Sequence, residues 1–344
     1  MPQKNKIYFI NYESVKLSGG DGRYAASSKA RDDIKSILLQ RQDIIYRPVV
    51  RKSTSTIKGG LELFIKLLFS LLTIPRGSKV FIQYPMIDIS IFKIISFFFS
   101  RYQVTALIHD LPSYRYDDIK KLRYSEISIL NKLYAIIVHS ESMKEVLKSD
   151  GVKTKMVVLG MFDYLLNDNQ KCKFESNSIV FAGALEKSLF LKQLHSINLT
   201  GISFNLYGRN LPNIPPNDNI RYKGSFLPDE ISTIKGEWGL LWDGISTDNC
   251  EGNYGNYLTL IAPHKFSLYV ACELKIIVWE KSAMAEFVQE KKLGIVVSSL
   301  NQISEKISSL SEIETKTMSD NIHALSKKIR EGDMFINAFN RIVS

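Results

Sequence analysis

The chain has 344 residues, a length that suits two folding domains of about 150–170 residues each. Hydrophobic residues make up 45% and charged residues 23%, which excludes an intrinsically disordered protein. The net charge of +10 comes from one half of the chain, because residues 1–165 contain 26 lysines and arginines against 15 acidic residues, and residues 166–344 contain 19 against 20.

A basic first half indicates an anionic partner, either nucleic acid or a membrane surface. We find no helix-turn-helix, zinc-finger or RNA-recognition signature, so we expect no nucleic acid. Two apolar runs, 61–72 and 91–99, are too short or too interrupted by charge to span a bilayer. They are either interfacial helices on an anionic membrane or buried core helices, and the sequence leaves both alternatives open.

Three cysteines are present, at positions 172, 250 and 272. The odd number, together with a first segment that passes directly into a strand pattern without a secretory signal, predicts free thiols in a reducing compartment. We therefore expect a cytoplasmic protein.

The first half alternates predicted strands and helices. Strands are expected at 7–11, 44–50, 79–83, 104–109, 134–139 and 155–159, and helices at 23–40, 60–74, 87–100, 117–132 and 142–150. Strands joined by helices pair in parallel, so this half is predicted to be a doubly wound open sheet. In such sheets ligands bind beyond the carboxyl ends of the strands.

Polar clusters follow four of these strands. They are the glycine-rich turn with Gly19, Gly20 and Asp21, then Tyr84-Pro85, His109-Asp110, and His139-Ser140-Glu141. The glycine-rich turn has neither the dinucleotide-binding spacing nor the lysine of a P-loop, so alone it identifies no ligand. The four clusters together predict a functional edge of the sheet.

The alternation stops in the polar stretch 166–177 and then restarts. Further strands are expected at 178–181, 204–208, 220–223, 238–243, 276–279 and 295–297, and helices at 188–194, at 228–235, from 263 and from 282. The predicted organisation is therefore a first α/β domain at 1–165, a linker at 166–177 and a second α/β domain at 178–325. A C-terminal helix at 326–344 could cross back to the first domain.

A lysine and a serine begin the helix that follows Pro263. Exposed amide groups and the helix dipole favour an anion at a helix start, and Lys265 in the first turn opposes the dipole unless an anion lies nearby. We expect Lys265 and Ser267 to hold a phosphate-bearing ligand. A solvent-facing lysine on an ordinary helix remains the alternative, and His264 is left open between ligand contact and helix packing.

At this point the sequence resembles a known family. Two tandem doubly wound domains with a phosphate-holding element in the second resemble the GT-B sugar-nucleotide glycosyltransferases. The sequence motifs are most similar to those of bacterial β-1,6-galactofuranosyltransferases and of the related glucosyltransferases that extend glycans on serine-rich adhesins. The matching segments are 108–110 (IHD), 136–140 (IIVHS), 159–164 (LGMFDY), 181–188 (FAGALEKS), 224–230 (GSFLPDE), 239–244 (GLLWDG) and 263–269 (PHKFSLY).

The resemblance implies a fold and a set of site residues. The fold is α/β, with two Rossmann-like domains and a cleft between them. The second domain would bind the uridine diphosphate of the donor. Its donor-binding residues would be Lys265 and Ser267 at the diphosphate, Gly183 and Lys187 beside it, Phe226 near the uracil, and Trp242 and Asp243 facing the cleft. Gly19, Gly20 and Asp21 would approach the donor from the first domain.

The chemistry requires charge compensation and a base. Without an Asp-x-Asp metal motif, the departing diphosphate must be stabilised by lysine, arginine and helix dipoles, so we expect a metal-independent enzyme without a cofactor. An inverting reaction needs a base for the acceptor hydroxyl. Asp110 is our first candidate, Asp21 the second and His109 the third. The alternative for Asp110 is a structural carboxylate that caps the turn at 111–113.

Retaining enzymes of this class often carry Glu-x7-Glu, and the equivalent positions here hold Leu260 and Leu268. Glu273 and Glu280 have the right spacing but lie too far along the chain. We therefore expect inversion, with galactofuranose transferred from UDP-galactofuranose to a lipid-linked surface glycan of O-antigen or capsule type. The enzyme would act in polysaccharide biosynthesis, as a peripheral protein on the inner face of the cell membrane.

Several alternatives remain at this point. The donor could be UDP-glucose or UDP-N-acetylglucosamine, or the chain could be a non-catalytic subunit that binds a sugar nucleotide. A two-lobed periplasmic-type receptor is disfavoured by the missing signal. A homo-oligomer also stays open.

Overall fold

The structure is a computed structural model, and it describes residues 6–14, 26–51, 56–116, 122–167 and 170–343. The chain divides into two compact units. The first unit contains residues 1–22, 31–159 and 335–344, and the second contains residues 23–30 and 160–334. The chain thus passes from one unit to the other after Leu159, and the residues that we predicted as a linker, 166–177, are counted with the second unit.

The first unit is a parallel six-stranded sheet in the order β2-β1-β3-β4-β5-β6. The strands are β1 (Ile7–Ser14), β2 (Ile44–Arg51), β3 (Lys79–Tyr84), β4 (Gln103–Ile108), β5 (Ala135–Val138) and β6 (Lys155–Val158). Register pairs Ile7 with both Ile44 and Lys79, so the strand order reverses between β1 and β3. At such a reversal, the loops after the two strands diverge and leave room for a ligand.

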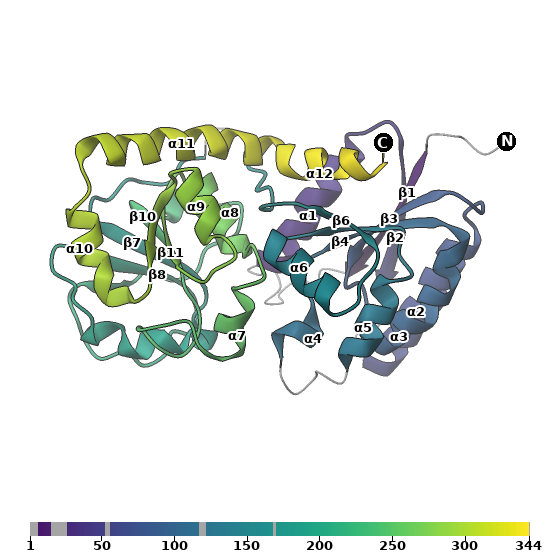
Figure 1. The fold of residues 1–344 in the computed structure, drawn as a ribbon, viewed down its shortest axis with the longest axis horizontal. Helices are drawn as coiled ribbons and strands as arrows, with labels where there is room; N and C mark the ends of the chain where they lie inside the picture. The colour runs from purple at the N-terminus through teal and green to yellow at the C-terminus, as the bar shows by residue number, and fades with distance from the viewer. Residues whose placement is uncertain (1–5, 15–25, 52–55, 117–121, 168–169, 344) are drawn as a thin grey trace. The chain divides into compact units, whose positions relative to one another are not determined.

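Helices cover both faces of this sheet. They are α1 (Ala26–Leu39), α2 (Thr56–Leu72), α3 (Ile89–Ile95), the 3₁₀ helix η2 (Ser96–Arg101), α4 (Pro112–Arg115), α5 (Arg123–Leu130), α6 (Glu141–Ser149) and α12 (Asp333–Val343). Figure 1 shows α2, α3 and α5 side by side on one face, and α3 packs against both of its neighbours. On the other face α12 packs on β3, with the Phe335 and Phe339 rings 5.6 and 5.1 Å from the Phe81 ring.

The second unit is also a parallel six-stranded sheet, in the order β12-β11-β10-β7-β8-β9. The strands are β7 (Ser178–Ala184), β8 (Ser203–Arg209), β9 (Ile220–Tyr222), β10 (Trp238–Leu241), β11 (Lys275–Trp279) and β12 (Gly294–Val297). The helices are η4 (Leu185–Lys187), η5 (Leu189–Ser196), η6 (Ile231–Thr233), α7 (Gly252–Tyr257), α8 (His264–Ala271), α9 (Ala285–Glu290), η7 (Leu300–Gln302), α10 (Ile303–Ser308) and α11 (Glu312–Glu331). The order reverses between β7 and β10, so this sheet has its own switch point.

The fold class predicted from the alternation is confirmed, since both units are doubly wound parallel sheets. The expected helices at 87–100 and 188–194 are present, the first as α3 followed by η2 and the second as the 3₁₀ helix η5. The expected helix at 228–235 is wrong, because this stretch contains only the short η6. Residues 228–235 bury only Ile231 and Ile234, too few apolar contacts to stabilise a longer helix.

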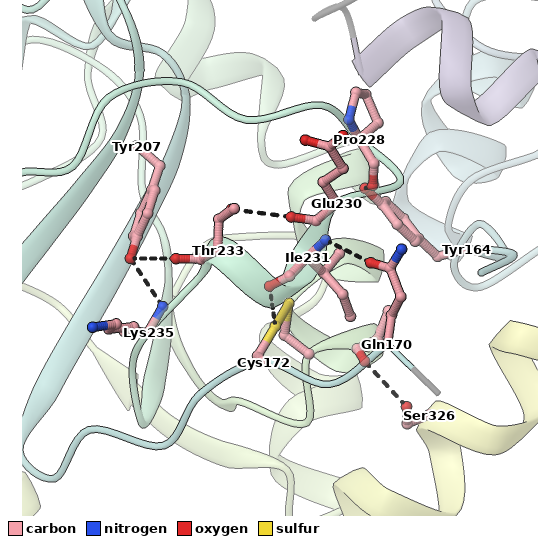
Figure 2. The surroundings of a disulfide bond; sticks show 12 residues. Tyr164, Gln170, Cys172, Tyr207, Pro228, Glu230, Ile231, Thr233, Lys235 and Ser326 are labelled. Atoms are coloured by element: carbon pink, nitrogen blue, oxygen red, sulfur yellow. Dashed lines mark hydrogen bonds between the residues drawn. A yellow bond between two sulfur atoms is a disulfide. The ribbon is translucent and has the colours of Figure 1, made fainter. Parts of the chain in front are cut away.

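The prediction of free thiols is wrong for two of the three cysteines. Cys172 and Cys272 form a disulfide with their Cα atoms 5.2 Å apart, whereas Cys250 is free and buried. Figure 2 shows the surroundings, in which the backbone N–H of Ile231 donates to Gln170 Oε1 at 3.1 Å. The bonded positions are 100 residues apart, and only the folding of the segment before β7 onto the end of α8 brings them together.

Candidate active site

Lys265 lies at the start of α8, at the carboxyl ends of β7 and β10. The position of α8 depends on Gly239 in β10, because a Cβ there would lie 2.3 Å from the Tyr269 ring. Tyr269 is one helical turn after Lys265, and its hydroxyl accepts a hydrogen bond from the Ala182 N–H of β7 at 2.9 Å. Together, the missing side chain and this hydrogen bond place the first turn of α8 over the switch point of the second sheet.

The Lys265 ammonium group is held in a small polar cluster. Its Nζ donates to Asp243 Oδ2 at 3.0 Å and to the Trp242 carbonyl at 3.3 Å, and it lies 4.5 Å from the Phe181 ring centroid. The Ser188 hydroxyl donates to the second carboxylate oxygen of Asp243 at 3.2 Å. Both side chains of the ion pair are largely buried, so the pair is positioned rather than solvated.

This cluster retains the capacity to bind an anion. An ammonium group has three N–H donors, and contacts within the described residues use two of those on Lys265. The residue before α8 is Pro263, and no side chain caps the first turn in the part of the chain that the structure describes. Uncapped amide groups, the helix dipole and a lysine at one point suit a phosphate group.

The backbone at the end of β7 is open to a ligand that binds at the start of α8. Gly183 has φ of +154°, and a Cβ built on it would meet nothing within 4 Å. Three residues after the strand, Lys187 is exposed, with its Nζ 5.9 Å from the Tyr254 ring centroid. The structure therefore brings Gly183, Lys187, Asp243 and Lys265 to one edge of the sheet.

Two more side chains occupy this edge further along. Phe226 follows β9 and is half-buried, with its ring 5.9 Å from Tyr207 in an edge-on arrangement. Arg209 ends β8, in register with Ala184, and the sequence analysis did not identify it. A cation as the last residue of a strand that points to the ligand edge was the signal that could have revealed it.

The side chains of two predicted donor residues point into the interior. Ser267 is buried, and its hydroxyl donates to the Phe162 carbonyl at 2.7 Å. The Trp242 ring is also buried, and its Nε1–H donates to the Ser246 carbonyl at 2.9 Å. Both side chains therefore hold the surrounding loops, and only the backbone carbonyl of Trp242 reaches Lys265.

His264 packs rather than binds. Its ring lies 5.1 Å from Tyr164 in a stacked arrangement and 6.1 Å from Phe162. Burial lowers the pKa of His264 to about 3, so the ring is neutral in the folded protein at neutral pH.

The desolvated ring of His264 predicts an acid-dependent loss of stability. Its pKa lies below the unfolded value of about 6.5, so the unfolded chain takes up the proton first and stability falls as the pH decreases from 6.5 towards 3. At pH 5 this costs about 2 kcal/mol. His264→Phe keeps the ring contacts and should flatten the pH dependence between 6.5 and 5.

Tryptophan fluorescence measures this effect in the second unit, which contains all three tryptophans, Trp238, Trp242 and Trp279. Unfolding at pH 7.5 supplies the control, because the histidine is neutral there in both states and only the packing differs. A variant that shows the same pH dependence as the wild type would contradict the assignment.

In the first unit, Asp110 and His109 follow β4 at the ligand edge of the sheet. Asp110 is partly exposed, and its Oδ1 lies 3.1 Å from the Arg115 guanidinium in α4. The backbone N–H of Ser113 in the same turn donates to buried Glu126 at 3.2 Å. Glu126 also accepts a hydrogen bond from the Tyr84 hydroxyl at 2.6 Å, and desolvation raises its pKa.

His109 belongs to a network that the sequence analysis missed. Its Nε2 lies 2.7 Å from Gln83 Oε1, which can only accept, so Nε2 carries the hydrogen. Gln83 Nε2 donates to Asn11 Oδ1 at 3.0 Å. Arg31 donates to the carbonyls of Gln83 and Pro85 at 3.2 and 2.7 Å.

Arg31 supplies the guanidinium group of this network. Burial lowers its pKa to about 10, while the negative charge of Asp110 acts in the opposite direction. The guanidinium group therefore remains charged at neutral pH and lies in the electrostatic field of Asp110. The predicted residues Gly19, Gly20 and Asp21 lie outside the described residues.

Two tandem doubly wound units, with an uncapped lysine-bearing helix start at the switch point of the second sheet, are the arrangement expected of a GT-B glycosyltransferase. Comparison with known proteins agrees. Residues 15–161 match the model of the glucosyltransferase 3-like N-terminal domain, and residues 179–342 match that of the corresponding C-terminal domain.

Individual relatives give the same result. The chain is 28% identical over 98% of both lengths to the β-1,6-galactofuranosyltransferase WbbI of Escherichia coli K12. It is 26% identical over 67% of both lengths to glucosyltransferase 3 of Streptococcus gordonii. Anabaena HepE, solved in complex with UDP, shares the fold with a TM-score of 0.57 at 12% identity over 98% of both chains. The protein therefore belongs to the glucosyltransferase 3-like family.

Proposed function

We propose that this glycosyltransferase transfers galactofuranose from UDP-galactofuranose to a lipid-linked surface glycan, with inversion at the anomeric carbon. The observation that carries the donor half is Lys265, held by Asp243 at the uncapped start of α8. The choice of sugar is supported by the similarity to the E. coli galactofuranosyltransferase, which extends over 98% of both chains.

The proposed chemistry separates charge compensation from proton transfer. The bond between the anomeric carbon and the diphosphate breaks, and the negative charge that develops on the leaving group meets Lys265, Lys187 and the α8 dipole. Since these groups carry the compensating charge, the proposal invokes no metal ion. The acceptor oxygen bonds to the anomeric carbon, and its proton passes to the Asp110 carboxylate.

Inversion is supported by the side chains that follow Lys265. Leu268 is buried on α8, at the position where the resemblance places the second glutamate that retaining GT-B enzymes often carry. Glu273 lies after the end of α8, with its Oε1 3.0 Å from His323 Nδ1, and so is engaged elsewhere. No carboxylate among these α8 residues is available for a retaining mechanism.

Glucose is the second candidate sugar, because the family description and the streptococcal relatives name glucosyltransferases. A direct comparison of donors decides between them. The full chain is incubated with UDP-galactofuranose, UDP-glucose or UDP-N-acetylglucosamine and a synthetic lipid-linked acceptor, and UDP release is measured.

With the acceptor present, we expect rapid UDP release from UDP-galactofuranose and not from the other two donors. NMR of the product should show a β-furanoside. Acceptor-dependent turnover of UDP-glucose only would replace galactofuranose with glucose. UDP binding without turnover of any donor would favour a non-catalytic subunit.

The proposed location is the cytoplasmic face of the cell membrane. It is supported by the basic excess of residues 1–165. Among the helices of the described residues, none is long and apolar enough to cross a bilayer.

A further inference from the structure

Helix α2 has apolar side chains on two faces rather than one. Leu63, Leu67 and Leu71 point into the core and are 5% exposed or less. The opposite stripe, at four- and three-residue spacing, is also apolar and reaches solvent. It consists of Leu61, Ile65, Phe69 and Leu72. A helix that only covers a sheet carries polar residues on its outer face, so this outer stripe requires a different explanation.

The neighbouring helices extend the stripe into a larger patch. Ile94 of α3 and Phe97 of η2 are exposed, and α3 packs directly against α2 (Figure 1). The six side chains, which we call the α2/α3 surface, are each between 50% and 70% exposed. Contiguous apolar side chains on this scale mark a contact surface, and they do not extend far enough to span a bilayer.

Cations border the α2/α3 surface. On α2, α3 and η2 they are Lys58, Lys66, Lys93 and Arg101, with Arg76 after α2 and Lys132 after α5, whereas the carboxylates are Glu62 on α2 and Asp88 just before α3. Glu62 is paired with Lys66 in the same helix, and Asp88 caps the start of α3. The border therefore has a clear excess of positive charge.

Lys132 lies beside the exposed ring of Phe97, and the charge of Lys93 acts on Lys132. Lys132 Nζ lies 3.6 Å from the ring centroid and donates to Ser96 Oγ at 3.2 Å, while Lys93 Nζ donates to Ser125 Oγ at 3.2 Å. Within the described ranges neither lysine pairs with a carboxylate. Partial burial and the charge of Lys93 lower the pKa of Lys132, as expected for two cations held close without a counterion.

We propose that the α2/α3 surface docks on an anionic lipid bilayer, with its apolar side chains in the interface and lipid phosphates at Lys93 and Lys132. Hydrophobic insertion and attraction of headgroups by lysines are the two components of interfacial binding. A second copy of the chain fits less well, because a two-fold interface would bring this cationic border against an identical one. This proposal deepens the proposed function, because an enzyme docked on the bilayer by the α2/α3 surface would reach a lipid-linked acceptor. It rests on the proposed function in this respect only.

Co-sedimentation of the full chain with vesicles tests the proposal. Binding is expected to vesicles of phosphatidylcholine mixed with phosphatidylglycerol, weaker binding to phosphatidylcholine alone, and a decline as salt is added. Phe69→Ser with Phe97→Ser should reduce the partition coefficient at least about tenfold, since two rings leave the interface. Lys93→Ala with Lys132→Ala should reduce it by about tenfold or more on the anionic vesicles only.

Matched controls separate the surface from general charge and hydrophobicity. Lys144→Ala with Lys148→Ala removes two lysines from α6, and Phe174→Ser removes a ring that is 74% exposed in the second unit. Both should bind like the wild type. Equal binding by all variants would overturn the proposal, as would wild-type self-association that the Phe69 and Phe97 substitutions abolish.

UDP titration of the same samples keeps the two proposals distinguishable. A chain that binds UDP but not anionic vesicles overturns the membrane surface and the proposed membrane location, and leaves the proposed donor site unaffected. A chain that binds the vesicles but not UDP overturns the proposed donor site alone.

Discussion

Lys265→Ala is expected to weaken UDP binding by about a hundredfold to a thousandfold and to reduce kcat/KM at least as much. The ammonium group contributes a charge-assisted hydrogen bond, worth about 1.5–3 kcal/mol. Its removal also leaves Asp243, now 3.0 Å from Lys265 Nζ, as an uncompensated carboxylate beside the diphosphate. Calorimetric titration with UDP measures the loss directly.

Two variants make the result specific. Lys316→Ala removes the same charge from an exposed ion pair on α11 and should bind UDP like the wild type. Asp243→Asn keeps the lysine, removes its competing carboxylate and should retain UDP binding. If Lys265→Ala bound UDP as tightly as the wild type and Lys187→Ala bound it more weakly, the diphosphate would have to bind near Lys187 and not at the start of α8.

The position of Lys265 could be predicted because its signal is local. A proline, a lysine in the first turn and a buried strand on either side are enough to place a helix start at the edge of a parallel sheet. Asp243 was predicted through the family resemblance, as the last residue of the strand expected at 238–243. Their mutual ion pair could not be predicted, because it depends on how closely α8 approaches β10 over Gly239.

The type of a residue did not predict the direction in which its side chain points. Ser267 and Trp242 lie in the right segments, yet both side chains turn into the interior and satisfy backbone carbonyls there. A buried hydroxyl or indole must find such a partner, and which carbonyl is near depends on loops distant in sequence. Phe162, the partner of Ser267, precedes it by 105 residues.

Contacts between residues distant in sequence also explain why the sequence analysis missed Gln83 and Arg31 in the first unit. Periodicity predicted the strands and therefore the edge at which His109 and Asp110 lie. Gln83 and Arg31 had no local signal, because Gln83 is inside a strand and Arg31 inside a helix. Only the pairing of β3 with β1 and β4 brings Gln83 beside both Asn11 and His109.

Asp110→Asn is expected to lower kcat by about 10²–10⁴-fold with little change in the affinity for UDP. The amide keeps the size and one hydrogen-bond acceptor of the side chain, but it cannot take the acceptor proton. UDP affinity should persist, because the proposed donor contacts belong to the second unit. Single-turnover kinetics at saturating donor, combined with UDP titration, measure the two quantities separately.

A structural role for Asp110 makes a different prediction. If the carboxylate served only to hold Arg115 at 3.1 Å, Arg115→Ala would reproduce the defect, and both variants would retain the pH–rate profile of the wild type. A base predicts instead that Asp110→Asn removes the acidic limb of the kcat profile while Arg115→Ala keeps it. Glu145→Gln, which removes an exposed carboxylate of α6, supplies the control for charge. Near-full turnover in Asp110→Asn would leave Asp21 and His109 as the candidates, and His109 would have to act through Nδ1, because its Nε2 already donates to Gln83.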